Sequence, residues 1–419
     1  YTGVPANPRV VLPVLNTERD KTYTEELRLV SKPGGPFDYV VGAFFQQQNK
    51  DIGLGITAPG ADIFTAASHG GSTVPIALGG TYVNLAPGSY LQDGVNKQTF
   101  REASLFGDLT WHVTDRWQVT GGARIFRQKF SQDYQMYNTL FFLDVAEQNR
   151  FKATSQIFKL NTSYQIGDAS QLYATFSQGF RRGGANAFPT EGLVLEPREL
   201  LTYKSDRTNN YEIGIKGKVS RIHYAANLFY VDWKDPQIDM TTPFVLTYVV
   251  INASRAESKG FEVELAGPIG DTGFSFNAGL AYAKARLTED FSLPAGSGGG
   301  TVVPNAIRGT KGDRLPGAPD LSGSFTLNYE TQAGSGDLLL SAGVDYRGSV
   351  VGSLPYSTRP EPFFKAPAYA LLRASVGYKW GGWEATLYGN NIANKHAVLL
   401  GLSRTASSIS LLGGWGDAY

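Results

Sequence analysis

The chain of 419 residues contains no cysteine, only two methionines and no apolar run long enough for a membrane-spanning helix. The absence of cysteine excludes disulfide frameworks and thiolate metal sites. The formal net charge is only +1, so the basic excess typical of nucleic-acid-binding proteins is also missing, and no nucleic-acid partner is expected. The length is sufficient for two or three soluble domains or for one large barrel.

Glycine and aromatic residues are plentiful, with 49 Gly, 24 Phe, 22 Tyr and 6 Trp. The mean hydropathy is −0.20. A strand of a membrane barrel is apolar on one face only, so a barrel can have a mean hydropathy near zero. This composition therefore favours a membrane barrel over a set of soluble domains.

The segment 366–394 alternates between apolar and polar residues, which is the period of a strand. Its apolar row comprises Ala368, Ala370, Leu372, Ala374, Val376, Tyr378 and Trp380, and after the Gly381-Gly382 turn it continues with Trp383, Ala385, Leu387 and Gly389. In a soluble sandwich such a row would face the core. In a membrane barrel it would face lipid, and the aromatic residues beside the turn would form an interfacial girdle.

A second hairpin over 102–128 repeats this arrangement, with Trp111 and Trp117 on either side of a short turn at Asp115-Arg116. Four of the six tryptophans therefore lie beside two short turns. We predict an interfacial girdle made of Trp111, Trp117, Tyr378, Trp380 and Trp383.

Similar hairpins are predicted along most of the chain, which gives about 14 strands joined alternately by short turns and long connections. Residues 1–23 are predicted to be a loop. The long connections are predicted near 47–98, 131–150, 183–208, 234–247, 288–317 and 349–365. A barrel built of consecutive hairpins has tight turns at one rim and long loops at the other. The predicted fold is therefore all-β, a transmembrane antiparallel β-barrel.

Several stretches resemble the barrel domain of TonB-dependent outer-membrane receptors, particularly the ferric-siderophore type. They are EELRLVS with FDYVVGAFF, YATFSQGFRRGGAN, NNYEIGIKGKV, ESKGFEVELAG, RLPGAPDLSGSFTLNYE and LYGNNIANKHA, and they occur in the order of the family. The resemblance implies a 22-stranded barrel in the outer membrane of a Gram-negative bacterium, crossing it many times and closed by an N-terminal plug.

The resemblance also implies partners: a ferric siderophore or similar small ligand, the TonB-ExbB-ExbD complex acting through a TonB box, and outer-membrane lipid with lipopolysaccharide. It implies no cofactor. Nothing in the chain resembles the plug or the TonB box, and the start YTGVPANPRV lacks the features of a signal peptide. We therefore expect residues 1–419 to be part of the barrel domain, roughly its eighth to twenty-first strands, and the working protein to be longer.

Arg181 and Arg182 end a predicted strand on its long-loop side. They could attract an anionic ferric chelate, or they could be structural charges paired with acids such as Glu212 or Glu262. Five tyrosines in or beside the predicted long loops could stack on a ligand or pack within the loops: Tyr134, Tyr137, Tyr203, Tyr248 and Tyr356.

Enzymatic activity is not expected. The four histidines, His69, His112, His223 and His396, are scattered and show no metal-binding spacing. Inward carboxylates such as Glu102, Asp108, Glu262 and Glu264 are interpreted as lumen wall rather than as acid–base pairs. A passive outer-membrane pore and a structural barrel within a membrane assembly remain the alternatives to a receptor.

Overall fold

The computed structural model describes residues 14–57, 90–138, 143–187, 194–195, 198–241, 248–292, 296–298, 301–303, 307–352, 354 and 364–399. Strands dominate these residues, and one short 3-10 helix spans Arg198–Leu201. In this part of the chain no helix is long and apolar enough to cross a membrane. The predicted all-β class is confirmed.

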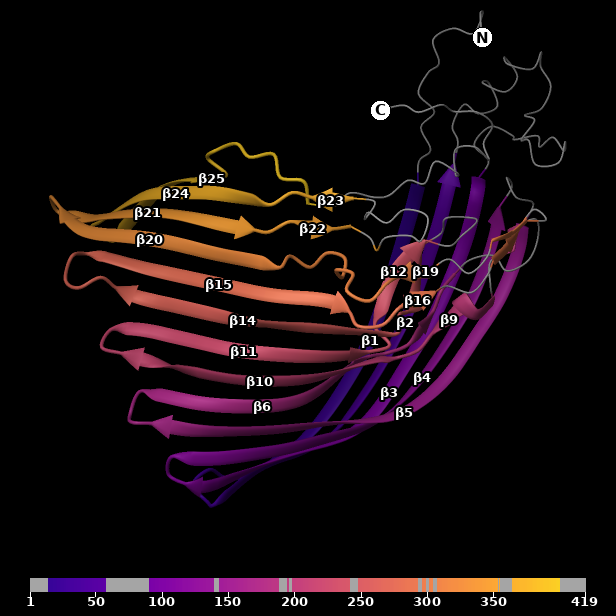
Figure 1. The fold of residues 1–419 in the computed structure, drawn as a ribbon, viewed down its shortest axis with the longest axis horizontal. Helices are drawn as coiled ribbons and strands as arrows, with labels where there is room; N and C mark the ends of the chain where they lie inside the picture. Colours follow the sequence, from indigo (N-terminus) through magenta and orange to yellow (C-terminus); the bar gives the residue numbers. More distant parts are fainter. Residues whose placement is uncertain are drawn as a thin grey trace, which may run out of the picture.

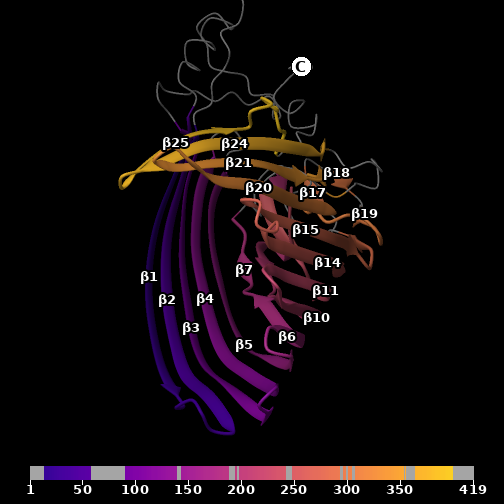
Figure 2. The same ribbon diagram turned by 90° about the vertical axis from the view of Figure 1, so that its left-hand side faces the viewer.

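Fourteen strands form one antiparallel sheet in which sequence neighbours are also spatial neighbours (Figures 1 and 2). They are β1 (Val14–Val30), β2 (Phe37–Thr57), β3 (Tyr90–Thr114), β4 (Trp117–Asn138), β5 (Leu143–Ile166), β6 (Ser170–Arg181), β10 (Asp206–Val219), β11 (Ile222–Lys234), β14 (Arg255–Pro268), β15 (Phe274–Leu287), β20 (Leu321–Ala333), β21 (Gly336–Arg347), β24 (Tyr369–Trp380) and β25 (Trp383–Asn390). The number agrees with the predicted 14. The sheet curves into a trough whose edges are β1 and β25 (Figure 2).

Eleven short strands lie in the longer connections. They are β7 (Gly184–Ala185), β8 (Val194–Leu195), β9 (Thr202–Tyr203), β12 (Gln237–Thr241), β13 (Tyr248–Asn252), β16 (Phe291–Ser292), β17 (Gly296–Gly298), β18 (Thr301–Val303), β19 (Ile307–Gly309), β22 (Val350–Val351) and β23 (Lys365–Ala366). Figure 1 shows β12, β16, β19, β22 and β23 together at the end of the trough opposite the tight turns. The connections therefore gather at one end.

Some predicted boundaries were wrong. The predicted loop over residues 1–23 contains the first half of β1, which begins at Val14. The predicted long connection over 131–150 does not exist as such, because β4 continues to Asn138 and β5 begins at Leu143. Likewise β2 ends at Thr57 and β3 begins at Tyr90, inside the predicted connection 47–98. In each case the outward-facing residues of the extension are mostly polar, so the outward apolar row ends before the strand does.

The two ends of the sheet differ as predicted. At one end, which we call the turn rim, tight turns join the strands; Gly381 and Gly382 in one of them have φ values of 50° and 85°. Two consecutive left-handed residues make the turn that matches the twist of a hairpin. The opposite end, which we call the loop rim, carries the longer connections (Figure 1).

The convex face of the sheet is apolar. Large exposed side chains recur at every second position, as in Phe37, Tyr39, Val41, Leu105, Leu109, Ile125, Ile213, Leu228, Leu280 and Phe325. A continuous apolar surface of this extent is not tolerated in water, whereas a barrel wall in a bilayer requires it. The apolar row predicted between 368 and 389 lies on this face, where Leu372, Val376 and Leu387 are exposed.

The concave face is divided into two halves. On β2–β5 it carries bulky side chains such as Phe44, Phe100, Phe126 and Phe130, and several of them are buried. On β14–β24 many inward positions hold small residues, which we call the small-residue wall: Gly260, Gly279, Ala281, Ala283, Ser322, Ser324, Ser341, Gly343, Ser375 and Gly377. Charged residues on the same face lie between them, namely Glu262, Glu264, Asp345 and Arg373. The largest apolar cluster lies at the loop rim, where the connections pack on Ala256 and Leu287.

A candidate ligand-binding site at the loop rim

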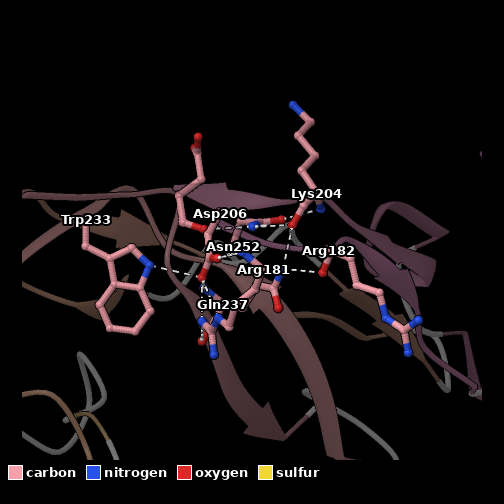
Figure 3. A network of polar contacts seen from close by, with 8 residues as sticks. Arg181, Arg182, Lys204, Asp206, Trp233, Gln237 and Asn252 are labelled. Atoms are coloured by element: carbon pink, nitrogen blue, oxygen red, sulfur yellow. Dashed lines mark hydrogen bonds and ion pairs between the residues drawn. The ribbon is translucent and has the colours of Figure 1, made fainter. Parts of the chain in front are cut away.

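A buried carboxylate organises the end of β6. Asp206 is only 1% exposed and accepts hydrogen bonds from the Arg181 backbone N–H at 3.0 Å, Arg181 Nε at 2.9 Å, Trp233 Nε1 at 3.0 Å and the Gln237 backbone N–H at 3.1 Å. The Arg181 guanidinium also lies over the Trp233 ring, 5.0 Å from its centroid (Figure 3). Arg181 is therefore committed to a structural ion pair.

The ion pair with Asp206 matches the interpretation of Arg181 as a structural charge, but the partners named for it, Glu212 and Glu262, were wrong. Glu212 instead accepts a hydrogen bond from the Tyr173 hydroxyl at 2.5 Å, and Glu262 accepts one from Asn227 Nδ2 at 3.0 Å. Register explains the difference, because Asp206 is the residue opposite Arg181 on the neighbouring strand β10.

Two amides fix the backbone around Arg181. Gln237 Nε2 donates to the carbonyl oxygens of Arg182 at 2.9 Å and Lys204 at 3.0 Å. Asn252 Nδ2 also donates to Lys204 O at 3.0 Å, and Asn252 Oδ1 accepts from the Lys204 backbone N–H at 2.7 Å (Figure 3). The two ends of the β6–β10 connection are thus tied to β12 and β13.

The Arg182 side chain points away from this network (Figure 3). Its guanidinium lies 4.1 Å from the centroid of Phe100, and Nη2 donates to Gln48 Oε1 at 2.9 Å. No carboxylate of the described residues pairs with it within 4.0 Å. Burial lowers the pKa of Arg182, but a guanidinium keeps its proton at any physiological pH. Arg182 thus carries a partly buried positive charge on the concave side of the sheet without a direct ion pair among the described residues, although the carboxylates of Asp20 and Glu102 lie near enough to stabilise it electrostatically.

Hydrogen-bonding groups line the neighbouring concave face of β3–β5. Glu102 accepts from Arg124 Nη2 and from Gln128 Nε2, the latter at 2.6 Å. Further toward the loop rim, Gln132 Oε1 accepts from Asn149 Nδ2 at 2.9 Å. The Phe126 and Phe180 rings stack beside them at 4.1 Å. Because Phe126, Gln128 and Gln132 are nearly fully buried, these groups form a packed, hydrogen-bonded wall next to Arg182.

The predicted tyrosines lie in different places. Tyr134 and Tyr137 are both inside β4 and not in a loop; because they are three residues apart, they face opposite sides of the sheet. Tyr134 is 7% exposed on the concave side, whereas Tyr137 is 53% exposed on the convex side. Tyr248 begins β13, and Tyr356 lies outside the described residues.

Tyr203 on β9 does lie near Arg182. Its hydroxyl packs so closely over Gly184 that a Cβ on that glycine would lie 2.2 Å from the oxygen. Burial raises the pKa of Tyr203, with the Arg182 charge acting in the opposite direction. Of the candidates named from the sequence, Arg182, Tyr203 and Tyr134 thus face the interior.

Gln48 and Phe100, which contact Arg182, and the nearby amides of Gln128, Gln132 and Asn149 were not among the predicted site residues. The period-two pattern of β3 and β4, continued past Arg101 and past Arg127, could have identified Phe100, Gln128 and Gln132 as inward-facing. Gln48 could not be found in this way, because it is 134 residues from Arg182 in the chain.

All five residues of the predicted girdle lie at the turn rim. Trp111, Trp117, Trp380 and Trp383 are exposed, and Trp117 Nε1 donates to Thr162 Oγ1 at 2.8 Å. Tyr378 stacks on Trp380 with 5.6 Å between centroids. Their role at a membrane interface stays a prediction. Among the residues that the structure covers, no group of three or more His, Asp or Glu side chains could hold a metal ion.

The hairpin-built sheet, its apolar convex face and its polar interior define the wall of a transmembrane antiparallel β-barrel. A family model described as TonB dependent receptor-like, beta-barrel matches residues 14–392, and the chain belongs to this family.

Curated relatives include pesticin receptors. That of Yersinia pestis is 23% identical over 318 residues, which are 74% of this chain and 42% of the relative. That of Yersinia enterocolitica is 24% identical over 288 residues, or 69% of this chain and 37% of the relative. The chain thus spans less than half the length of the curated relatives it matches.

Solved structures show the same fold. The ferric yersiniabactin uptake receptor FyuA from Yersinia pestis aligns with a TM-score of 0.72 and 20% identity, covering 94% of this chain and 52% of FyuA. The siderophore receptor PiuA from Acinetobacter baumannii aligns with a TM-score of 0.64 and 17% identity, covering 91% and 52% of the two chains. At these identities the likeness concerns the fold alone.

Proposed function

We propose that the whole protein is a TonB-dependent active-transport receptor in the outer membrane of a Gram-negative bacterium. A ferric siderophore is the foremost candidate for its ligand. Membership of the receptor family supports the class, and the names of FyuA and PiuA support the ligand type. The observation that carries the proposal for this chain is the guanidinium of Arg182 on the inner side of the barrel wall, which makes no direct ion pair with the described residues.

The ligand would approach from the loop rim. There it meets Arg182, with Tyr134, Tyr203 and the amides of β3–β5 beside it. A siderophore surrounds its iron with its own donor atoms, so the barrel needs an anion-binding site rather than metal ligands. Arg181 supports the site by fixing the backbone from which Arg182 projects. Tyr356 remains a candidate, whereas Tyr137 lies on the convex face of β4, on the other side of the sheet from this site.

Transport would use the TonB-ExbB-ExbD complex, acting on a plug that belongs to the whole protein. Under this proposal the protein performs no bond chemistry, and the barrel serves to bind the ligand and to let it pass when the plug rearranges. The girdle of Trp111, Trp117, Tyr378, Trp380 and Trp383 would place the turn rim at one membrane interface.

The test is an Arg182→Gln substitution in the full-length protein. A hydrogen bond between charged groups contributes roughly 1.5–3 kcal/mol, so we expect ferric-siderophore affinity to fall by roughly ten- to a hundredfold. Arg182→Lys should retain part of the affinity. Lys284→Gln, which removes an exposed positive charge from the outer face of β15, serves as the matched control and should change nothing.

Iron uptake in cells distinguishes the alternatives. A receptor of this class loses radiolabelled iron uptake when TonB is deleted or the proton gradient is collapsed. Uptake that persists in both conditions would indicate a passive pore. Normal iron uptake after deletion of the whole gene, under iron limitation and for every siderophore supplied, would contradict the proposal and favour a structural role.

A further inference from the structure

The two adjacent arginines at the end of β6 have surroundings of the same kind. The Arg181 guanidinium lies over the Trp233 ring and donates to a buried carboxylate. The Arg182 guanidinium lies over the Phe100 ring and donates to Gln48 Oε1 at 2.9 Å. Each guanidinium thus packs on an aromatic ring beside one side-chain acceptor. The acceptor is charged for Arg181 and neutral for Arg182, and this difference decides which of the two keeps its charge available.

The register of β1, β2 and β3 builds the surroundings of Arg182. Gln48 on β2 lies directly opposite Phe100 on β3, so the amide and the ring are neighbours on the concave face. On the other side of β2, β1 places Asp20 at the next concave-facing position toward the loop rim. Side chains from three neighbouring strands therefore meet around a guanidinium that comes from the end of a fourth strand, β6.

Asp20 fixes the orientation of the Gln48 amide. Gln48 Nε2 donates to Asp20 Oδ2 at 2.6 Å, and this contact turns Gln48 Oε1 toward Arg182. If the amide were reversed, its NH2 group would face the guanidinium, and both groups are donors. The Asp20 carboxylate therefore determines, through the amide, that Arg182 meets an acceptor.

The amide also separates Arg182 from the charge of Asp20. An amide oxygen accepts a hydrogen bond without adding a formal charge, whereas a carboxylate in its place would form a charge-assisted pair with the guanidinium. Asp20 attracts Arg182 only from behind the amide. Lys50 Nζ lies 3.6 Å from Asp20 and 2.5 Å from Glu18, so one cation is shared by two acids. A net negative charge therefore remains behind Gln48.

We propose that Gln48 is the positioning residue that keeps Arg182 available to an anionic ligand, and that Asp20 sets the strength of this binding through the Gln48 amide. This inference rests on the proposed function, in which Arg182 meets the ligand. The ring and the amide hold the guanidinium in place, so little side-chain entropy remains to be lost on binding. Arg181 differs, because its charge is already paired with a carboxylate.

The experiment moves a negative charge toward Arg182 or away from it in the full-length protein. Gln48→Glu places a carboxylate directly against the guanidinium. Gln47→Glu is the matched control: Gln47 is the neighbouring residue, faces the convex side, and accepts a hydrogen bond from Arg101 Nε at the same distance of 2.9 Å. Affinity is measured at several ionic strengths by titration with the ferric siderophore that binds the parent most tightly.

Gln48→Glu should weaken ferric-siderophore binding about tenfold, which corresponds to ~1.4 kcal/mol, and should reduce the dependence of binding on ionic strength. Gln47→Glu should bind as the parent does. Asp20→Asn keeps an acceptor for the amide but removes the charge behind it, so affinity should rise about threefold. A purely structural role of the Asp20–Gln48 contact predicts no such gain.

A double variant separates the direct contact from the summed charge. Asp20→Asn/Gln48→Glu has the net charge of the parent, but its carboxylate lies against Arg182 instead of behind the amide. Its affinity should stay as low as that of Gln48→Glu. Recovery of the parent affinity would overturn the proposal, because summed charge would then explain both single variants. Unchanged thermal unfolding midpoints verify that the variants are folded.

Arg182 can also be probed without a ligand. Phenylglyoxal modifies guanidinium groups, and pairing with a carboxylate protects them. Its rate of reaction at Arg182, measured by mass spectrometry, should fall in Gln48→Glu and stay unchanged in Gln47→Glu. Equal rates in these two variants, or a lower ligand affinity in Asp20→Asn, would overturn the proposal. A parent that binds no ferric siderophore would instead contradict the proposed function, and the phenylglyoxal rates would still test the role of Gln48.

Discussion

At the scale of single residues, Gly260 and Gly121 illustrate how differently two strand glycines are constrained. A Cβ on Gly260 would lie 1.7 Å from the Tyr282 carbonyl oxygen on β15, whereas a Cβ on Gly121 would have no atom within 4 Å. Neither glycine has a positive φ. The difference is therefore one of space and not of backbone conformation.

Gly260→Ala should accordingly force β14 and β15 apart. Overpacking of this kind costs typically ~1–3 kcal/mol, and a clash with backbone belongs at the upper end. Gly121→Ala should be neutral or slightly stabilising, because alanine restricts the unfolded chain more than glycine does. Urea unfolding of the refolded full-length barrel in lipid measures both. Equal unfolding midpoints for the two variants would contradict this prediction.

Arg181 and Arg182 show what the sequence can and cannot tell about a site. The same two interpretations apply to both adjacent arginines in the sequence, yet Arg181 is a structural partner of Asp206 and Arg182 makes no direct ion pair with the described residues. The distinction depends on Asp206, 25 residues away, and on Gln48, 134 residues away. Without the register of the strands, neither partner can be assigned.

At the scale of elements, the Asp206 network connects β6, β10, β11 and β12. Asp206→Asn keeps the shape of the side chain but removes its charge from the Arg181 guanidinium, which is half exposed. A hydrogen bond between charged groups contributes roughly 1.5–3 kcal/mol, and exposure reduces this. We expect a destabilisation of about 1–2 kcal/mol, concentrated in the β6–β10 connection.

Limited proteolysis of the folded barrel can locate this effect. The Asp206→Asn variant should be cleaved faster between residues 182 and 205 than elsewhere. Asp271→Asn is the control: its pair with Arg221 lies in a turn and Asp271 is 97% exposed, so its loss should have no measurable effect. Uniform cleavage along the chain in the Asp206 variant would mean that the network stabilises the whole sheet and not the connection.

Strand types were easier to predict than strand lengths. The halves of β3 and β4 nearer the turn rim have the pattern of a half-buried strand, because Leu105 and Ile125 alternate there with polar residues. In the halves nearer the loop rim, cations on the convex face alternate with amides on the concave face, as Lys129 does with Gln128 and Gln132. The outward positions there are charged and the inward ones mix amides with rings such as Phe130, so the hydropathy pattern is weak, and the partner strands explain why the segment is extended.

At the scale of the whole molecule, the separation of tight turns from long connections was predictable, because the sequence shows it as an alternation of connection lengths. One connection departs from the rule: only residues 139–142 separate β4 from β5 at the loop rim. The connection is short because β4 and β5 are themselves long. Their pairing runs without interruption from Trp117 opposite Tyr164 to Asn138 opposite Leu143.

The two rims should be on opposite sides of the outer membrane. Because the 419 residues contain no cysteine, single substitutions can report this directly. Lys311→Cys at the loop rim should react with a membrane-impermeant maleimide on intact cells. Asp168→Cys in the β5–β6 turn should react only after the outer membrane is permeabilised. The reverse pattern would mean that the barrel is oriented the other way and would contradict the proposed entry of ligand at the loop rim.

The small-residue wall has a mechanical consequence. Only hydrogen, methyl or hydroxymethyl groups project from Gly260, Ala281 and Ser324, so the points of attachment in this half of the interior are limited to isolated charged side chains such as Glu262, Glu264 and Asp345. A segment pulled along this wall would break few side-chain contacts as it moved, whereas along β3–β5 it would have to break contacts with rings and hydrogen bonds with amides. A pulling force applied inside the barrel would therefore produce sliding on one side and anchoring on the other.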